Sequence, residues 1–237
     1  MKKNILFLSL LIISANSWSE CKIGDLEVDP NISQTPEGTP NPSNYVTITG
    51  QKVLTKAIAN INIGTLIKTK LDINISNSNI IAFEYVFKKP INLNSNELAS
   101  GFITGTSNLD GIIFAAPSFG TAYGSQQNLF SSFISGNISP NQSQNEVIAN
   151  ETVRVGIYYN QLSKKIGYIV NGVNKGYTWN YTTPLSKMTF GISIEQGFYN
   201  TNSSALGKEI SFEIISDHSK LQFIYPAGTT DICGTTI

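Results

Sequence analysis

Residues 153–177 read VRVGIYYNQLSKKIGYIVNGVNKGY, and this stretch decides the fold class. Apolar side chains alternate with polar or small ones over residues 153–159, which is the two-residue period of a half-buried strand. The polar residues 160–164 then reverse the chain, and residues 166–170 return with the same pattern. Asn171-Gly172 follows, a dipeptide that suits the positive φ angles of a tight hairpin turn. The stretch therefore predicts antiparallel strands joined by short turns.

The same alternation recurs on both sides of this stretch, at residues 67–75, 81–87, 188–194, 210–214 and 221–225. The last two runs predict a hairpin whose tip is Ser216-Asp217-His218-Ser219. These residues do not indicate a catalytic triad, because Ser, His and Asp side chains that are adjacent on a turn cannot converge on one another. No segment keeps a helical period for three turns, although residues 96–100 and 144–150 each favour a short helical turn. The sequence predicts an all-β, antiparallel β-sandwich with a few short helical turns.

Composition excludes several classes of partner. The 237 residues include 16 Lys and Arg against 16 Asp and Glu, so there is no basic excess of the kind that binds nucleic acid or an anionic membrane. Charged residues make up only 14%, against about 25% in an average soluble domain, which favours an extracellular all-β protein. A sandwich of this length can be one domain, and we expect residues 20–237 to form it.

The first residues have the order of a secretory signal peptide. Two lysines precede an apolar run at residues 5–13, which is too short to span a bilayer, and small or polar residues follow. We expect residues 1–19 to be removed after Ser19, with a cut after Ser17 as the alternative. A lipid anchor on Cys21 is disfavoured because a carboxylate precedes it where a small residue is needed. The mature protein is expected in the periplasm or outside the cell, with no transmembrane segment.

Two cysteines remain after this cleavage, Cys21 and Cys233. In an oxidising compartment their natural pairing is a disulfide that brings the two ends of the chain together. Two unconnected thiols are the alternative, whereas a zinc site is not expected, because it normally takes four ligands and the chain has one histidine. Residues 29–44 carry four prolines and few apolar side chains, which predicts an extended surface strap.

Two resemblances follow from these residues. The paired strands at residues 153–159 and 166–172, which end in Val-Asn-Gly and are followed by Gly176, resemble those of concanavalin A-like lectin/glucanase domains, the LamG-like jelly rolls. With the signal peptide, Cys21 and the tail at residues 225–234, the whole chain resembles a family of secreted bacterial proteins whose domain has no assigned function. These resemblances imply a jelly-roll fold and an extracellular address, and they imply no activity.

Glucanases of this fold class carry catalytic carboxylates two or more residues apart on one strand. Only residues 25–29 (Asp-Leu-Glu-Val-Asp) have that spacing. They lie near the expected mature N-terminus and directly before a proline, which favours a solvated strand edge over a catalytic strand. We therefore assign no catalytic residue. A hydrolase would have to bring together acids from separate strands, for which Glu84, Glu195 and Glu213 are the candidates.

No cofactor is expected. Calcium is an alternative at Asn108-Leu109-Asp110-Gly111, because lectins of this fold often hold it through Asp, Asn and backbone oxygens. A type I turn explains the same four residues, and we favour the turn.

A sugar site needs aromatic faces for stacking and amides or hydroxyls for the ring oxygens. Two segments offer them, and the candidate ligand-binding residues are Asn174, Tyr177, Trp179 and Tyr181 in one, and Tyr123, Gln127 and Asn128 in the other. The three aromatic residues of the first segment alternate, so we expect them to share one face of a strand. Cross-strand packing and ordinary loops are the structural alternatives for the two segments.

The sequence thus predicts a secreted, non-catalytic binding module that is carbohydrate-binding and lectin-like, with a glycan or another cell-surface component as its partner. The alternatives are a glycoside hydrolase of the same fold and a structural or adhesive envelope protein without a small-molecule site. The sequence does not indicate an oligomeric state.

Overall fold

The computed structural model describes residues 21–29, 44–90, 93–94, 97–106, 113–116, 118–121, 128–132, 144–147, 150–181 and 185–237. The predicted signal peptide lies outside these residues, as do almost all of the predicted strap and all of the predicted turn at residues 108–111. In the described part, no helix is long and apolar enough to cross a membrane.

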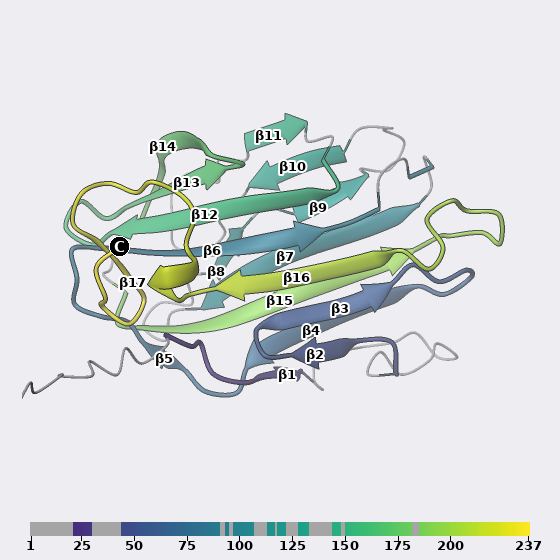
Figure 1. The fold of residues 1–237 in the computed structure, drawn as a ribbon, viewed down its shortest axis with the longest axis horizontal. Helices are drawn as coiled ribbons and strands as arrows, with labels where there is room; N and C mark the ends of the chain where they lie inside the picture. Colours follow the sequence, from purple (N-terminus) through teal and green to yellow (C-terminus); the bar gives the residue numbers. More distant parts are fainter. Residues whose placement is uncertain are drawn as a thin grey trace, which may run out of the picture.

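Two antiparallel sheets face each other (Figure 1). The strands of the eight-stranded sheet, in spatial order, are β14 (Val173–Asn180), β13 (Lys165–Val170), β12 (Thr152–Asn160), β6 (Ile80–Lys88), β16 (Glu209–Ile215), β3 (Lys52–Lys56) and β2 (Thr47–Thr49), with β17 (Thr229–Asp231) parallel to β6. The strands of the six-stranded sheet are β1 (Leu26–Val28), β4 (Ile63–Thr69), β15 (Lys187–Gly197), β7 (Leu98–Thr106) and β8 (Ile113–Ala116), with β5 (Ile73–Asn74) beside β15.

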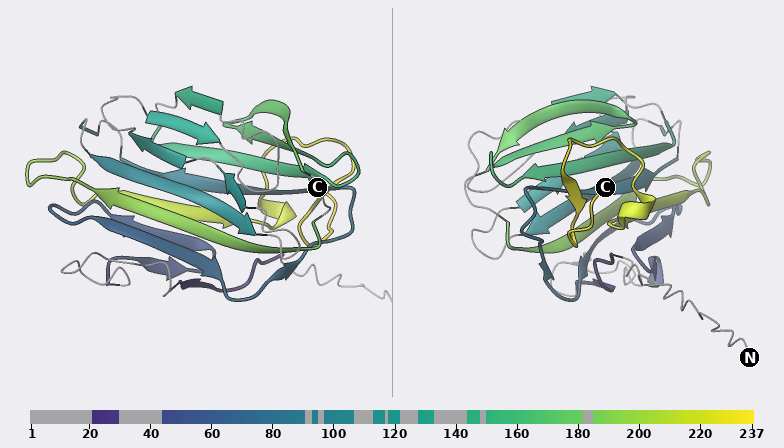
Figure 2. Two further views of the ribbon diagram at one scale, coloured as in Figure 1. Left: turned by 180° about the vertical axis from the view of Figure 1, so that it is seen from behind. Right: turned by 60° about the vertical axis from the view of Figure 1, so that its left-hand side comes forward.

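A smaller, three-stranded sheet consists of β9 (Ser118–Thr121), β10 (Asn128–Ser132) and β11 (Gln144–Val147). Figure 2 shows the molecule from behind, where the six-stranded sheet lies in front. The arrangement confirms the prediction of an all-β, antiparallel sandwich of the jelly-roll kind.

The core lies between the two large sheets and is made by the alternating apolar residues that predicted the strands. Ile81, Phe83, Tyr85 and Phe87 of β6 are all at most 2% exposed. The Phe83 ring meets Phe190 of β15 edge to face, with 4.9 Å between ring centroids, so the inner faces of the two sheets are in contact. Burial of such side chains is the main stabilising contribution to a sandwich of this size.

The central hairpin is confirmed in detail. β12 and β13 pair from Val155 opposite Val170 to Asn160 opposite Lys165, and the turn after β13 has positive φ at Asn171 (46°). Asn adopts positive φ more readily than most other non-glycine residues, and for this reason Asn171-Gly172 predicted a tight turn at this position.

Three local predictions are wrong. The run at residues 67–75 is two strands, β4 and β5, because the chain bends between them and leaves Leu71 79% exposed. The segments expected to form short helical turns, residues 96–100 and 144–150, contribute instead to β7 and β11, where pairing with neighbouring strands outweighs local preference.

The third error concerns the predicted hairpin near the C-terminus. β16 ends at Ile215, the short 3₁₀ helix η2 (His218–Lys220) follows, and residues 221–225 are not a strand. This segment crosses in front of the eight-stranded sheet, where it is drawn in yellow in Figure 1. We call residues 221–226 the C-terminal crossing segment.

Candidate functional site

The predicted aromatic segment lies on β14, the edge strand of the eight-stranded sheet next to β13. The register pairs Tyr177 with Gly167 and Trp179 with Ile166, so β14 contains an extra residue, Thr178, at a β-bulge, and a second register shift lies between Asn174 and Tyr177. A bulge shifts the alternation of side chains by one position. Two residues that would otherwise share a face are then separated onto opposite faces.

This is what happens to Tyr177 and Tyr181. Tyr181 is 3% exposed and belongs to the main core, where its ring lies 6.4 Å from that of Tyr159. Tyr177 is 40% exposed and contacts Tyr158, on the face of the sheet that points away from the core. The expectation of one shared aromatic face is therefore wrong, and Tyr181 is a core residue.

Trp179 follows the bulge, and its backbone pairs with Ile166, but its side chain is outside what the structure describes. Tyr123 and Gln127 lie outside the described residues as well. The backbone of Asn128 begins β10 in the three-stranded sheet, so the structure does not bring it into the sheet that carries Tyr177.

A row of three residues supports Tyr177 on the outer face. Tyr158, Gly167 and Tyr177 lie side by side on β12, β13 and β14. Because Gly167 has no side chain, the two rings meet above it edge to face, with 5.1 Å between their centroids. A Cβ atom at position 167 would overlap the Tyr158 ring, so this contact requires glycine. Tyr158 is 1% exposed and forms the floor beneath the more exposed Tyr177.

Hydrogen bonds hold both rings in place. The Tyr158 hydroxyl donates to Asn174 Oδ1 at 2.9 Å, and burial raises the pKa of Tyr158, which keeps that donor protonated. The same Asn174 oxygen accepts the backbone N–H of Gly176 at 2.8 Å. Asn160 Nδ2 donates to the Tyr177 hydroxyl oxygen at 3.1 Å. Tyr177 is thus an exposed ring in a fixed position rather than a loose surface side chain.

The C-terminal crossing segment completes the surface. Phe223 and Tyr225 lie over Gly156 of β12, where a Cβ atom would meet the Tyr225 hydroxyl and the Phe223 ring. The Tyr225 ring is 6.1 Å from that of Tyr158. We call Tyr158, Tyr177, Phe223 and Tyr225 the outer aromatic cluster. Of these four residues only Tyr177 could be identified as a candidate from the sequence, although the two glycines inside strands were a signal that another group approaches closely there.

Glu84 anchors the crossing segment from below. Its side chain is fully buried on the outer face of β6 and accepts the backbone N–H groups of Gln222 (2.8 Å) and Phe223 (2.9 Å) and the hydroxyl of Tyr225 (3.0 Å). Its other oxygen pairs with Arg154 of β12. A carboxylate that satisfies this many donors is a structural anchor.

The other acids that the sequence offered as catalytic candidates do not come together. Asp25 and Asp29 flank β1 at the edge of the six-stranded sheet, and each lies near a lysine, Asp25 at 3.8 Å from Lys70 and Asp29 at 3.0 Å from Lys68. Glu213 is exposed on β16, in the eight-stranded sheet with Glu84. The backbone of Glu195 belongs to β15 in the six-stranded sheet, so the structure does not bring the three candidate acids into one sheet.

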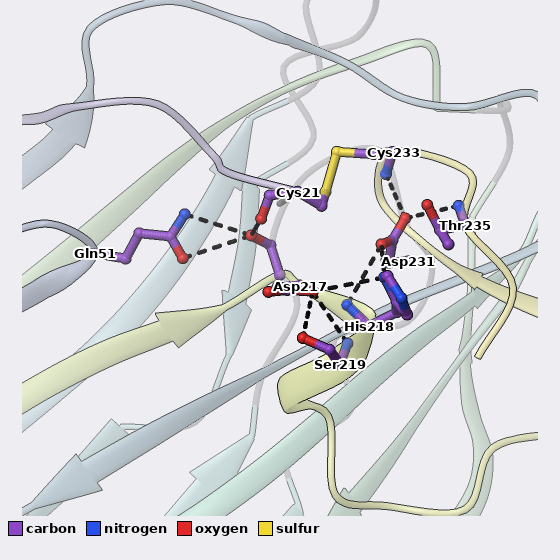
Figure 3. The surroundings of a disulfide bond; sticks show 9 residues. Cys21, Gln51, Asp217, His218, Ser219, Asp231, Cys233 and Thr235 are labelled. Carbon is purple, nitrogen blue, oxygen red and sulfur yellow. Dashed lines mark hydrogen bonds and ion pairs between the residues drawn. A yellow bond between two sulfur atoms is a disulfide. The ribbon is translucent and has the colours of Figure 1, made fainter. Parts of the chain in front are cut away.

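The two cysteines form the expected disulfide, with their Cα atoms 5.8 Å apart (Figure 3). Asp231 lies beside it, fully buried, and accepts the backbone N–H groups of Cys233 and Thr235, each at 2.9 Å. His218 Nδ1 is 3.3 Å from the other Asp231 oxygen. Ser219 Oγ donates to Asp217 at 2.9 Å rather than to the histidine, so these residues do not form a nucleophile–base pair.

A pocket of about 380 Å³ opens next to the disulfide. Its lining includes the charged side chains of Lys22, Asp25, Glu213, Asp217 and Lys220. Charges of both signs line it, and none of the described residues that line it is aromatic, so a stacked sugar ring is better accommodated at the outer aromatic cluster.

Comparison with known proteins supports the fold. A family model described as "Domain of unknown function (DUF4882)" matches residues 51–235. A search of curated protein sequences finds no match. Among solved structures, an endo-1,3-beta-glucanase from Streptomyces sioyaensis is similar with a TM-score of 0.51 and 11% identity, over 80% of this chain and 87% of the glucanase.

Two further structures are similar at lower scores. The CBM2 module of the evolved Dit of Lactobacillus casei BL23 phage J-1 has a TM-score of 0.48 and 14% identity, over 83% of this chain and 90% of the module. A sialidase has a TM-score of 0.42 and 12% identity, over 80% of this chain, which spans only 16% of the sialidase chain.

Proposed function

Because this chain belongs to the family described as "Domain of unknown function (DUF4882)", which names no activity, we propose a function from the site itself. The chain is a secreted, non-catalytic module that binds a glycan on the exposed ring of Tyr177. The observation that carries this proposal is a 40% exposed aromatic ring held by a buried tyrosine on one side and by a side-chain amide at its hydroxyl.

The arrangement matches what sugar binding requires. A sugar ring presents C–H groups to an aromatic face and hydroxyl groups to nearby amides. Asn174 and Asn180 are exposed on the same strand as Tyr177, and Asn160 contacts the Tyr177 hydroxyl. Because Tyr177 is held before any ligand arrives, little conformational entropy is lost on binding.

Secretion is part of the proposal and is supported by the disulfide between Cys21 and Cys233. Such bonds persist in oxidising compartments and are rare in the cytosol. A fold that also serves an endo-1,3-beta-glucanase is compatible with a glycan ligand, but fold likeness alone does not name one.

The rival proposal of a glycoside hydrolase has less support. It needs two carboxyl groups about 5 to 10 Å apart, with one of them free to transfer a proton. Glu84 already accepts three hydrogen bonds besides its ion pair with Arg154, and it is fully buried. The second alternative is a structural or adhesive envelope protein without a glycan site. The binding experiment distinguishes it from a glycan-binding module, because such a protein would bind no glycan at Tyr177.

The test is affinity gel electrophoresis and calorimetry of the mature, oxidised protein with a panel of bacterial and host polysaccharides. We expect at least one glycan to bind and Tyr177→Ala to weaken that binding about tenfold, the effect of losing roughly 1.4 kcal/mol of stacking. Tyr45→Ala, a change at a half-buried tyrosine before β2, is the matched control and should leave binding unchanged. Equal affinity of the Tyr177→Ala protein and the wild type would refute the site.

A further inference from the structure

Asn174, Asn160 and Tyr177 each offer a ligand a hydrogen-bond donor, because the amide oxygens of the two asparagines already accept bonds inside the protein. Asn174 Oδ1 accepts from both Tyr158 and the backbone N–H of Gly176. A backbone N–H can only donate, so it fixes the orientation of the amide and leaves the Nδ2 group of this exposed residue as the part that can contact a ligand.

The same reasoning applies to Asn160 and Tyr177. Asn160 Oδ1 accepts the backbone N–H of Ser163 at 2.9 Å, which fixes that amide, and its Nδ2 group donates to the Tyr177 oxygen. A hydroxyl that accepts one bond still has its own hydrogen to donate. The Tyr177 hydroxyl therefore also offers a donor, and a ligand that suits this surface is rich in acceptors.

The local charge is positive. Residues 150–181 carry four basic side chains, those of Arg154, Lys164, Lys165 and Lys175, against one acid, Glu151, although the whole chain has equal numbers of each. Arg154 is neutralised by its ion pair with the buried acid of β6. Two of the lysines, Lys164 and Lys165, are exposed at the turn that follows β12 and at the start of β13.

Lys165 is the lysine best placed to act on a ligand at Tyr177. It is exposed and pairs with Asn160 on one side and Asn180 on the other. It lies two positions from Gly167, so the two residues share the outer face of β13. No ion pair joins Lys165 to a carboxylate in the described parts of the chain.

We propose that the Tyr177 site selects an anionic glycan, in which the sugar carries a carboxylate or a sulfate ester, and that Lys165 binds this negative charge. The inference rests on the proposed function and adds the class of ligand. Carboxylate and sulfate share the property that matters here, since each is a charged acceptor of several hydrogen bonds.

The experiment compares polysaccharides that differ only in charge. Polygalacturonate is paired with its methyl ester, and dextran sulfate with dextran, so that the first pair tests carboxylate and the second tests sulfate. In about 0.15 M salt, we expect the wild type to bind the charged member of at least one pair and its neutral partner roughly fivefold or more weakly, the effect of one exposed charge contact.

Variants separate Lys165 from general electrostatic attraction. Lys165→Gln should abolish the preference for the charged polysaccharide, and Lys165→Arg should retain it. Lys164→Gln removes the same charge from the neighbouring exposed residue in the turn and should leave the preference intact. Thermal unfolding of each variant checks that the fold is unchanged.

The outcomes distinguish this inference from the proposed function. If neutral glycans bind in a Tyr177-dependent manner and the charged and neutral members of both pairs bind equally, the inference is wrong and the function stands. An equal loss in the Lys164→Gln and Lys165→Gln proteins also overturns the role of Lys165. If no polysaccharide of the panel binds, the proposed function and the inference both fail.

Discussion

Glu84 of β6 and Arg154 of β12 form an ion pair across neighbouring strands, and the Glu84 side chain is completely buried although it points away from the core. Its cover is the C-terminal crossing segment, whose backbone N–H groups at Gln222 and Phe223 donate to the carboxylate. Arg154 in turn donates to the carbonyl oxygen of Lys220 at 2.8 Å. The pair thus fastens the end of the chain to the middle of the sheet.

Replacing Glu84 with Gln should destabilise the protein by about 3 kcal/mol, because it leaves Arg154 unpaired and puts an amide among groups that donate. Urea denaturation at pH 7 measures this loss. Glu213→Gln removes the same charge from an exposed position of the same sheet and should change the midpoint very little. A Glu84→Gln protein as stable as the Glu213→Gln protein would contradict the anchoring role.

Replacing Gly167 with Ala tests the floor of the proposed site. The new methyl group would overlap the Tyr158 ring and force it to move, at a cost of about 1–3 kcal/mol. Since Tyr158 supports Tyr177, glycan affinity should fall as well. Gly24→Ala is the control. Its φ of 82° strains an alanine, but apart from its chain neighbours no atom of the described residues lies within 4 Å of the added methyl group, so glycan affinity should be unchanged. Unchanged affinity in the Gly167→Ala protein would show that Tyr158 does not position the site.

The burial of Lys89 should make the free energy of unfolding depend on pH in the alkaline range. It is 1% exposed, its Nζ atom has no hydrogen-bond partner among the described residues, and burial lowers its pKa to about 8. In the unfolded chain the pKa is near 10.5, so between pH 8 and 10.5 the unfolded state binds more protons than the folded state does. The contribution of Lys89 to stability therefore rises with pH across this window.

The measurement is the difference in unfolding free energy between wild type and Lys89→Met, since the difference cancels the titration of other groups. At pH 7 the methionine protein should be more stable by about 3 kcal/mol, the equivalent of a pKa shift from 10.5 to about 8. The advantage should shrink steadily from pH 8 upward. A difference that does not vary with pH would mean that Lys89 titrates normally.

The disulfide should contribute strongly to stability because Cys21 and Cys233 are separated by 212 positions. In the chain-entropy model a loop of this length restricts the unfolded state by roughly 5 kcal/mol, and measured values usually fall below that. We expect the Cys21→Ser, Cys233→Ser double variant to lose about 2–5 kcal/mol in urea denaturation. Reduction of the wild type should produce a similar loss, and an unaffected midpoint in both experiments would contradict the expectation.

The regular part of the fold could be predicted because burial on one face leaves a period of two in the sequence. Residues 81–87 and 153–159 show that period, and both are central strands whose apolar residues are buried. The same rule failed at residues 221–225, where Leu221, Phe223 and Tyr225 also recur at every second position but the two aromatic rings are partly buried against the outside of a sheet. Alternation reports a buried face and does not say which sheet the segment joins.

The site was only partly predictable for a related reason. Tyr177 and Asn174 were identified from residue type, but the bulge at Thr178 depends on how β13 and β14 align, which a single strand does not reveal. For the same reason the burial of Tyr181 could not be foreseen. Contacts between residues far apart in the sequence, such as Glu84 with Tyr225, have no local pattern at all.

The bond between Cys21 and Cys233 closes a covalent ring that contains all the residues between these two cysteines, which are 212 positions apart. A peptidase that cuts one loop in that interval opens the ring without releasing a fragment. The nicked molecule keeps its mass on a non-reducing gel and separates into two pieces only after reduction. If the protein is secreted as we propose, a single cleavage by an extracellular peptidase would leave the two parts of the molecule linked by the disulfide.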